Sequence, residues 1–166
     1  MRRLWRDLIM FVIGGVSGTV FGVGVGFFIF PYVFARPPAA DALTASDRAQ
    51  LVASGRFIHA NPSDPIHYGK GGVSVHRESV FLEPDFEVGP GPAYHVYLVP
   101  KASIRSTADM KDVMFVDLGR LRSFKGSQRY AIPQGVNLAN YSSVVIWCER
   151  FGVLISPADL TAKAGS

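Results

Sequence analysis

The sequence of 166 residues contains a single cysteine, Cys148. One cysteine excludes an intrachain disulfide framework and any zinc or iron–sulfur site that needs several thiolates. The haem-attachment motif Cys-x-x-Cys-His is also absent, which excludes a c-type cytochrome. A standard blue-copper site is excluded as well, because neither histidine nor methionine follows Cys148. Any thiol chemistry in this chain therefore depends on Cys148.

Signatures of hydrolases and nucleotide-binding proteins are missing too. The sequence has no Gly-x-Ser-x-Gly, no His-Glu-x-x-His, no P-loop and no dinucleotide fingerprint. No cluster of Lys and Arg alternates with aromatic residues, so nucleic acid is not an expected partner. Whether the chain is an enzyme stays open, and redox chemistry is the remaining option.

Residues 8–34 form an apolar run of 27 residues without a charge. About 20 helical residues cross the hydrocarbon core of a bilayer, whereas the apolar region of a signal peptide has about 7–15 residues. The length favours an uncleaved, single-pass membrane anchor that contacts lipid through residues 8–34. A cleaved signal remains the alternative, because residues 40–42 read Ala-Asp-Ala, which resembles a cleavage site.

The basic residues lie mostly around this run. Arg2, Arg3 and Arg6 precede it, and Arg36 and Arg48 follow it. Three against two favours a cytoplasmic N-terminus, with the rest of the chain outside the cytoplasm, in the periplasm or at the cell surface if the source is bacterial. The net charge of +4 therefore indicates an anchor rather than a nucleic-acid face.

Glycine recurs every four residues within the apolar run, at Gly14, Gly18, Gly22 and Gly26. This spacing places the four residues on one helix face, where small residues allow another helix to approach closely. We expect a homodimer or a partner helix at this face. A glycine-rich anchor without a specific mate is the alternative, because glycine is common in such helices.

The chain divides into four parts: a tail and anchor (1–35), a Pro/Ala linker (36–54), a β-domain (55–160) and a C-terminal tail (161–166). In the linker, residues 46–54 are expected to form a short helix with Ser46 as its N-cap and Gly55 after its end. Short apolar or alternating runs then follow between glycine and proline turns. They predict an all-β sandwich or jelly-roll-like barrel of about ten short strands. The expected strands are 56–60, 67–70, 73–77, 79–83, 86–88, 94–99, 113–118, 128–132, 144–151 and 153–155.

Cys148 lies in the most β-prone run of the β-domain, residues 143–153. In a strand, Cys148 shares a face with Val144 and Ile146, near the end of the strand. A free cysteine on such an apolar face is commonly buried and inert. A reactive thiolate needs a basic neighbour, and Arg150 would lie on the same face two residues further on. A core residue and a redox thiol or ligand both remain open.

The four histidines are His59, His67, His76 and His95. No two share an expected strand, so any joint site has to be assembled across strands. Their ordinary role is that of half-exposed strand residues. Together with Cys148, a histidine could ligate haem or a metal, and His95 and His67 are favoured because each lies beside a loop shaped by glycine or proline.

Five segments together resemble one known family. They are GPAYHVYL at 91–98, DLGRL at 117–121 with GSQRYAIP at 126–133, SVVIWCERFGV at 143–153, and ADL at 158–160. In this order they resemble the DM-thirteen domain family, a proposed electron-transfer domain found beside DOMON domains in Skeletor-like animal proteins and in bacterial membrane-anchored proteins. The resemblance implies that Cys148 is a redox thiol or the ligand of a group such as haem.

Two functions follow. The first is a membrane-anchored extracytoplasmic domain with a redox or electron-transfer role centred on Cys148, which acts on a redox partner protein with haem or no cofactor. Trp147 and Phe151 would flank or shield the thiol. The second is a binding or structural β-module in which Cys148 only fills the core. Residues 89–93 and 103–112 would then form its binding edge.

Overall fold

The computed structural model of the protein describes residues 2–33 and 37–163. Phe34 and Arg36, where the expected anchor meets the linker, and residues 164–166 of the expected tail lie outside the described residues. The chain falls into two compact units, Met1–Ala35 and Arg36–Ser166. We describe each unit by itself.

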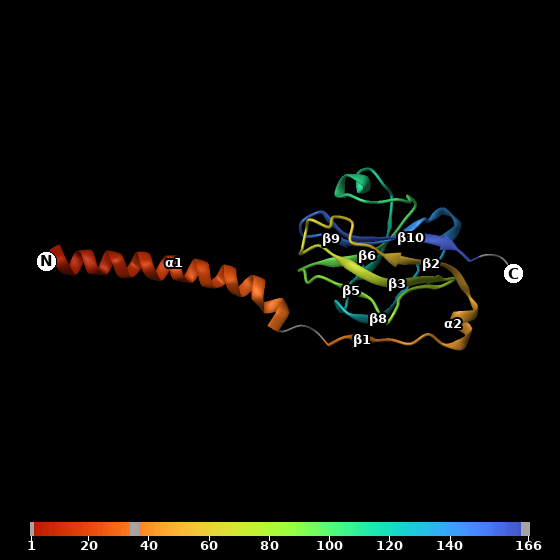
Figure 1. Ribbon diagram of the computed structural model, residues 1–166, viewed down its shortest axis with the longest axis horizontal. Coiled ribbons are helices and arrows are strands. Elements are labelled where there is room, and N and C mark those ends of the chain that lie inside the picture. Colours follow the sequence, from red (N-terminus) through yellow and green to blue (C-terminus); the bar gives the residue numbers. More distant parts are fainter. Residues whose placement is uncertain (1, 34–36, 164–166) are drawn as a thin grey trace. The chain divides into compact units, whose positions relative to one another are not determined.

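The first unit contains one helix, α1 (Arg2–Val33), of 32 residues (Figure 1). At a rise of 1.5 Å per residue, this helix is about 48 Å long. Its length and composition are sufficient to cross a membrane, a property shared by membrane anchors and signal sequences. A Cβ atom added at any of the four spaced glycines would meet nothing within 4 Å, which leaves this face open to a partner helix; they are Gly14, Gly18, Gly22 and Gly26. Association through that face stays a prediction.

The second unit is a β-domain, and the described residues contain ten strands. They are β1 (Ala39–Ala40), β2 (Leu51–Phe57), β3 (Gly69–His76), β4 (Ser79–Leu82), β5 (Glu87–Val88), β6 (Tyr94–Val99), β7 (Val116–Arg120), β8 (Gly126–Ala131), β9 (Ser143–Cys148) and β10 (Val153–Ala162). Three short helical segments join them: α2 (Ala45–Ala49), η1 (Thr107–Met110) and η2 (Leu138–Asn140).

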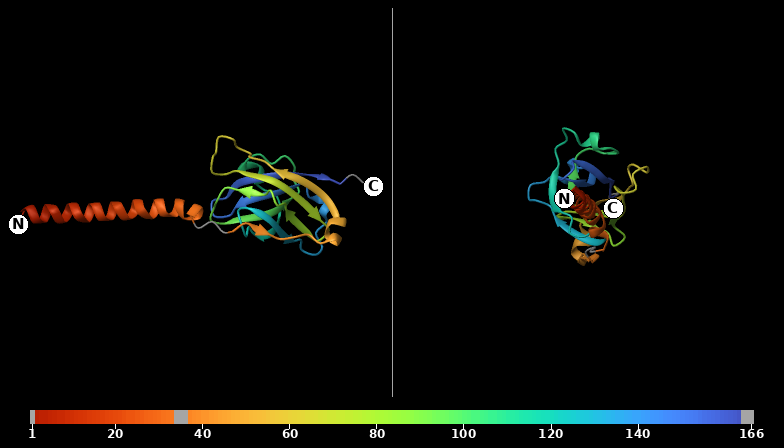
Figure 2. Two further views of the ribbon diagram at one scale, coloured as in Figure 1. Left: turned by 60° about the horizontal axis from the view of Figure 1, so that its bottom comes forward. Right: turned by 90° about the vertical axis from the view of Figure 1, so that its left-hand side faces the viewer.

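The ten strands form one curled sheet, a half-barrel (Figure 2). The order across the sheet is β1-β8-β4-β3-β2-β10-β9-β6-β7, and β5 pairs with β3. Every pair is antiparallel except β1 with β8. The prediction of an all-β fold with about ten strands is therefore confirmed, and the barrel-like alternative describes it.

The prediction of a helix over residues 46–54 was wrong in its extent. Helix α2 ends at Ala49, and β2 already begins at Leu51. The N-cap is Thr44 rather than Ser46, because the Thr44 side chain accepts a hydrogen bond from the Asp47 backbone N–H. Leu51 pairs with β3, and Ala53 and Ser54 pair with both β3 and β10, so sheet pairing overrides their weak helical pattern.

Other strand boundaries differ from the prediction as well; β9, for example, ends at Cys148 rather than at residue 151. Strand β3 runs through Gly71 and Gly72, which were expected to interrupt it. Gly71 has a φ of 104°, and a Cβ atom there would lie 2.5 Å from the Cα of Phe86, so glycine permits a close backbone approach inside a strand. Strand β10 extends to Ala162, beyond the expected end at residue 155.

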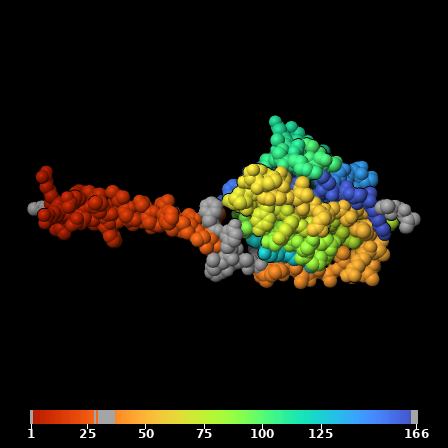
Figure 3. Space-filling view, in the orientation of Figure 1, coloured from red at the N-terminus to blue at the C-terminus, as the bar shows by residue number. Residues whose placement is uncertain are grey.

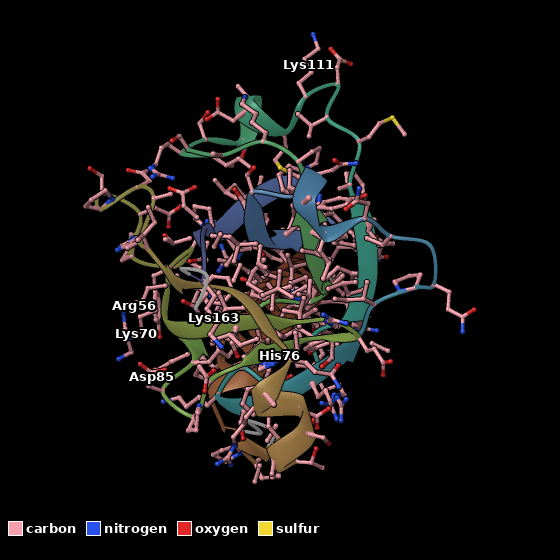
Figure 4. The ribbon with its side chains drawn as sticks, turned by 90° about the vertical axis from the view of Figure 1, so that its right-hand side faces the viewer. Arg56, Lys70, His76, Asp85, Lys111 and Lys163 are labelled. Carbon is pink, nitrogen blue, oxygen red and sulfur yellow. The ribbon has the colours of Figure 1, made fainter. Side chains whose placement is uncertain are left out.

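The interior of the curled sheet is a continuous apolar core (Figure 4). Alternate residues of each strand point into it, as strand geometry requires. On β6, the inward residues Tyr94, Val96 and Leu98 are at most 3% exposed. On β9, Cys148 belongs to the same set. Residues 94–99 therefore alternate between the two faces of the sheet.

A second apolar cluster lies on the outer face of β6, β9 and β10. It contains the outward residues Tyr97, Val99 and Val145, and it is covered by Ile104 and Met110. Both covering residues belong to the insertion between β6 and β7, which protrudes from the domain (green in Figures 1 and 3). The insertion therefore carries core residues of its own.

Residues 39–47, which precede β2, are held along β8 by strand pairing and side-chain contacts. Strand β1 pairs in parallel with β8, the carboxylate of Asp41 contacts the guanidinium of Arg122, and the hydroxyl of Ser127 donates to the Asp41 carbonyl at 2.7 Å. Arg129 extends this contact through its ion pair with Asp47 at 2.8 Å. Residues 39–47 are thus part of the β-domain.

Candidate functional site

Cys148 is the last residue of β9, and only 1% of it is exposed. Its backbone lies opposite Tyr94 of β6 on one side and Val153 of β10 on the other. The Gly152 N–H donates to the Cys148 carbonyl at 2.8 Å and closes the exposed turn that follows. The thiol therefore lies in the apolar interior, and the residues directly after Cys148 form a short surface turn.

The neighbours in sequence do not surround the thiol as expected. Trp147 packs against the second apolar cluster, on the opposite face of the sheet. Phe151 is 62% exposed, so it does not shield Cys148. Arg150 is in the exposed turn after the end of β9, so strand alternation does not bring its guanidinium to the face of Cys148.

The surroundings of Cys148 do not fit an axial haem ligand. A haem needs an open pocket beside its ligating sulfur, whereas Cys148, Tyr94 and Ile146 are at most 3% exposed and belong to one close-packed cluster. His95 lies opposite Trp147 in the ladder, whereas Cys148 lies opposite Tyr94. His95 and Cys148 therefore point to opposite faces of the sheet and cannot share one ion.

His95 instead lies on the outer face among polar side chains and one phenylalanine. We call this group the outer cluster, and it consists of His95, Tyr97, Phe115, Asp117 and Glu149. Three elements bring it together. His95 and Tyr97 are outward residues of β6, Asp117 is paired with Tyr97 on the neighbouring strand β7, and Glu149 directly follows β9. Residues up to 54 positions apart in the sequence thus meet at one edge of the sheet.

The polar groups of the outer cluster form a continuous chain of contacts. The hydroxyl of Tyr97 donates to Oε1 of Glu149 at 2.9 Å. Oε2 of Glu149 lies 3.3 Å from Nε2 of His95, and Nδ1 of His95 lies 3.0 Å from Oδ2 of Asp117. These contacts connect the buried phenol of Tyr97 to the carboxylates of Glu149 and Asp117, whose side chains are 45% and 38% exposed.

Tyr97 is enclosed on its other sides. Only 3% of it is exposed, and its ring stacks on that of Phe115 with the centroids 4.1 Å apart and the planes 12° from parallel. Burial, together with the neighbouring carboxylate of Glu149, raises the pKa of the Tyr97 phenol well above its ordinary value. The phenol is therefore held protonated at neutral pH.

The outer cluster also has the composition of a metal site. One ligand atom from each of His95, Asp117 and Glu149 lies within 4.8 Å of the others. Both ring nitrogens of His95 already face a carboxylate, however, so an ion would have to replace one of these contacts. The remaining carboxylate would then orient the ring, as partners of metal-bound histidines do.

The other three histidines serve local structure. Nδ1 of His67 contacts Oδ2 of Asp64 at 2.6 Å, within the turn before β3. His59 contacts the carbonyl of the same Asp64 at 2.7 Å. His76 is 3% exposed and contacts the Asp47 carbonyl at 2.7 Å. Each therefore has a protein partner, and His67 lies in a different part of the fold from the outer cluster.

The sequence alone favoured His95 but missed its partners. Asp117 and Glu149 lie in segments that resemble the DM-thirteen family, but nothing in those segments links them to His95, and only the pairing of β7, β6 and β9 brings them to it. One signal was available: His95 and Tyr97 are two residues apart in a strand and therefore lie on the same face of it. Without the order of the strands, this shared face could not identify the acidic residues on the neighbouring strands.

Comparison with known proteins gives one match. Residues 63–160 match a family model described as "Electron transfer DM13". The match includes Cys148 and the outer cluster, and it leaves out α1, β1, α2 and β2. No curated protein and no solved structure matches the chain.

Proposed function

This chain belongs to the electron-transfer DM13 family, and we propose that it is a membrane-tethered, extracytoplasmic redox domain with Cys148 as its thiol centre. The observation that carries the proposal is the family match over residues 63–160, which includes Cys148, the one thiol of the sequence. The exposed turn directly after Cys148 is the route by which this buried thiol would reach a partner. Helix α1 would be the anchor, with its N-terminus in the cytoplasm.

The chemistry is thiol–disulfide exchange with a partner protein. The Cys148 thiolate attacks a disulfide of the partner, one new S–S bond forms, and the partner's S–S bond breaks. One partner sulfur leaves as a thiolate, so Cys148 is oxidised while a partner cysteine is reduced. Because the thiol is buried, exchange requires local opening of the turn formed by residues 149–152.

Thiol labelling of the full-length protein in detergent tests this proposal. The labelling rate of Cys148 is measured with a small disulfide reagent across a series of denaturant concentrations. We expect a rate with little denaturant dependence, because opening a single turn exposes little surface. Cys148→Ser should consume no reagent. A rate that follows global unfolding at every concentration would refute a redox thiol.

Gly152→Ala should accelerate the labelling, because Gly152 has a φ of 61° and alanine strains the turn. Gly135→Ala is the matched control: Gly135 has a φ of 85° and lies in a different loop. In both positions a Cβ atom would meet nothing within 4 Å, so only backbone strain differs from wild type. Equal acceleration by both variants would point to global destabilisation rather than opening of the turn.

Membrane tethering has its own test. The protein expressed in its source organism should sediment with the membrane fraction and keep residues 1–35, as measured by intact mass. A soluble product that begins after residue 42 would identify α1 as a cleaved signal.

A binding or structural β-module is the second candidate function. The observation in its favour is the same burial, since Cys148 packs among apolar residues of the interior such as Tyr94 and Ile146. The loop 89–93 and the exposed part of the insertion would then form the binding edge. If the Cys148→Ala variant still binds every partner that the wild type binds, the result would favour this function.

A further inference from the structure

We propose that Tyr97 is a proton-coupled redox residue, which gives one electron to an oxidised metal centre of a partner protein while its phenolic proton passes to Glu149. The proposal deepens the proposed function, since it rests on this chain transferring electrons. It does not depend on Cys148, which lies on the opposite face of the sheet.

The step balances within the outer cluster. The O–H bond of Tyr97 breaks, an O–H bond forms at Oε1 of Glu149, and the electron reduces the partner's metal centre by one unit of charge. The products are a neutral phenoxyl radical and a neutral carboxylic acid. When an electron returns to Tyr97, the proton moves back along the same hydrogen bond.

The geometry supplies the proton acceptor. An oxidised phenol is a strong acid, and the carboxylate of Glu149 lies 2.9 Å from its oxygen, within the reach of direct proton transfer. The second oxygen of Glu149 contacts His95, which Asp117 orients from its other nitrogen. Glu149 is therefore held in position for the proton, and its partial exposure connects it to water.

The surroundings protect the radical. Tyr97 is almost completely buried, Phe115 covers one face of its ring, and apolar residues of the second core cluster, including Val99 and Val145, pack near it. Small reductants in solution therefore have little access to the ring. Because burial also keeps the reduced phenol protonated, the electron and the proton leave together.

Tyr130 provides the contrast within the same domain. It is 5% exposed, yet its hydroxyl donates to an amide oxygen, Oε1 of Gln128, at 2.8 Å. An amide oxygen is a far weaker base than a carboxylate. The guanidinium of Arg122 also lies 5.6 Å from the Tyr130 ring centroid, where a positive charge disfavours oxidation. Tyr130 is thus a buried tyrosine without a proton acceptor.

The experiment is photo-oxidation of the full-length protein in detergent, with EDTA present to remove metal ions. Light-excited tris(bipyridine)ruthenium with persulfate serves as the one-electron oxidant, and the frozen sample is examined by electron paramagnetic resonance. We expect a tyrosyl radical signal in the wild type that falls in Tyr97→Phe and is unchanged in Tyr130→Phe. A signal of equal size in Tyr97→Phe would overturn the proposal.

Glu149→Gln tests the proton transfer itself. It keeps the phenol and a hydrogen-bonding oxygen but removes the base, so the rate of radical formation should fall at least about tenfold. An unchanged rate would overturn the proton coupling. Cys148→Ser should keep the radical signal, so a failure of the thiol proposal and a failure of the Tyr97 proposal are distinguished. Thermal denaturation of each variant confirms that the fold is retained.

Discussion

Cys148 and Tyr94 lie directly opposite each other in the β9–β6 ladder, and both side chains belong to the interior of the curled sheet. We expect Cys148→Ser to lower the free energy of unfolding by about 1–3 kcal/mol, because a buried hydroxyl would lack the apolar fit of a thiol and a hydrogen-bond partner. Urea denaturation measures this difference.

Cys148→Ala is the control for that loss. Alanine leaves a small cavity but buries no polar atom, so it should cost less than serine. If serine were tolerated as well as alanine, the side chain would have access to water, contrary to its 1% exposure.

The alternation of apolar residues predicted the faces of the central strands. Tyr94, Val96 and Leu98 share one face of β6, because a strand with two buried faces still alternates between two different cores. The same rule placed Cys148 on an apolar face near the end of its strand. Local patterns were sufficient for these assignments because each depends on one strand only.

Long-range pairing could not be predicted in the same way. The segment 39–47 looked like a linker, since its fastening depends on Asp41 meeting Arg122, 81 residues away. Residues 103–112 were expected only as part of a binding edge, although Ile104 and Met110 are buried against the sheet. The outer cluster likewise depends on which strands are neighbours, and no local sequence signal contains that information.

The fastening of β1 along β8 depends on a glycine. Gly126 has a φ of 85°, and a Cβ atom there would lie 2.1 Å from the carbonyl oxygen of Ala39. We therefore expect Gly126→Ala to separate β1 from β8, which should appear as faster hydrogen exchange of the Ala39 and Asp41 amides.

Gly135→Ala is again the matched control, because Gly135 has the same φ of 85° but open space around it. It should cost only the backbone strain of about 1–2 kcal/mol. If Gly126→Ala leaves exchange at residues 39 and 41 as slow as in Gly135→Ala, the contact between β1 and β8 is not the constraint we describe.

Asp64 should make stability depend on acid pH. The hydrogen bond from the side chain of His67, followed by backbone N–H donors, lowers the pKa of Asp64 from 3.8 to about 2. A lowered pKa means that the folded state binds the proton more weakly than the unfolded state. The ionised group therefore contributes stability above about pH 4, and this contribution is lost as the pH falls to about 2.

The comparison of wild type with Asp64→Asn isolates that contribution. Above pH 4 the wild type should be the more stable protein in urea denaturation, and the difference should shrink as the pH falls towards 2. His67→Ala should remove most of the same pH dependence, because it removes the main cause of the shift. A difference that is constant from pH 2 to pH 6 would contradict the role of this pair.

The insertion between β6 and β7 should act as part of the core rather than as a detachable loop. Ile104 is fully buried in the second cluster, beside Val145 and Tyr97, so Ile104→Ala should lower the free energy of unfolding by about 2–5 kcal/mol. Met114, in the same insertion, is 87% exposed, and Met114→Ala should change stability by no more than about 0.5 kcal/mol. Urea denaturation measures both variants.

Because the second cluster covers one side of Tyr97, Ile104→Ala should also shorten the lifetime of the Tyr97 radical, whereas Met114→Ala should leave it unchanged. Equal effects of the two substitutions on stability would mean that the insertion does not cover the outer face of the sheet in solution.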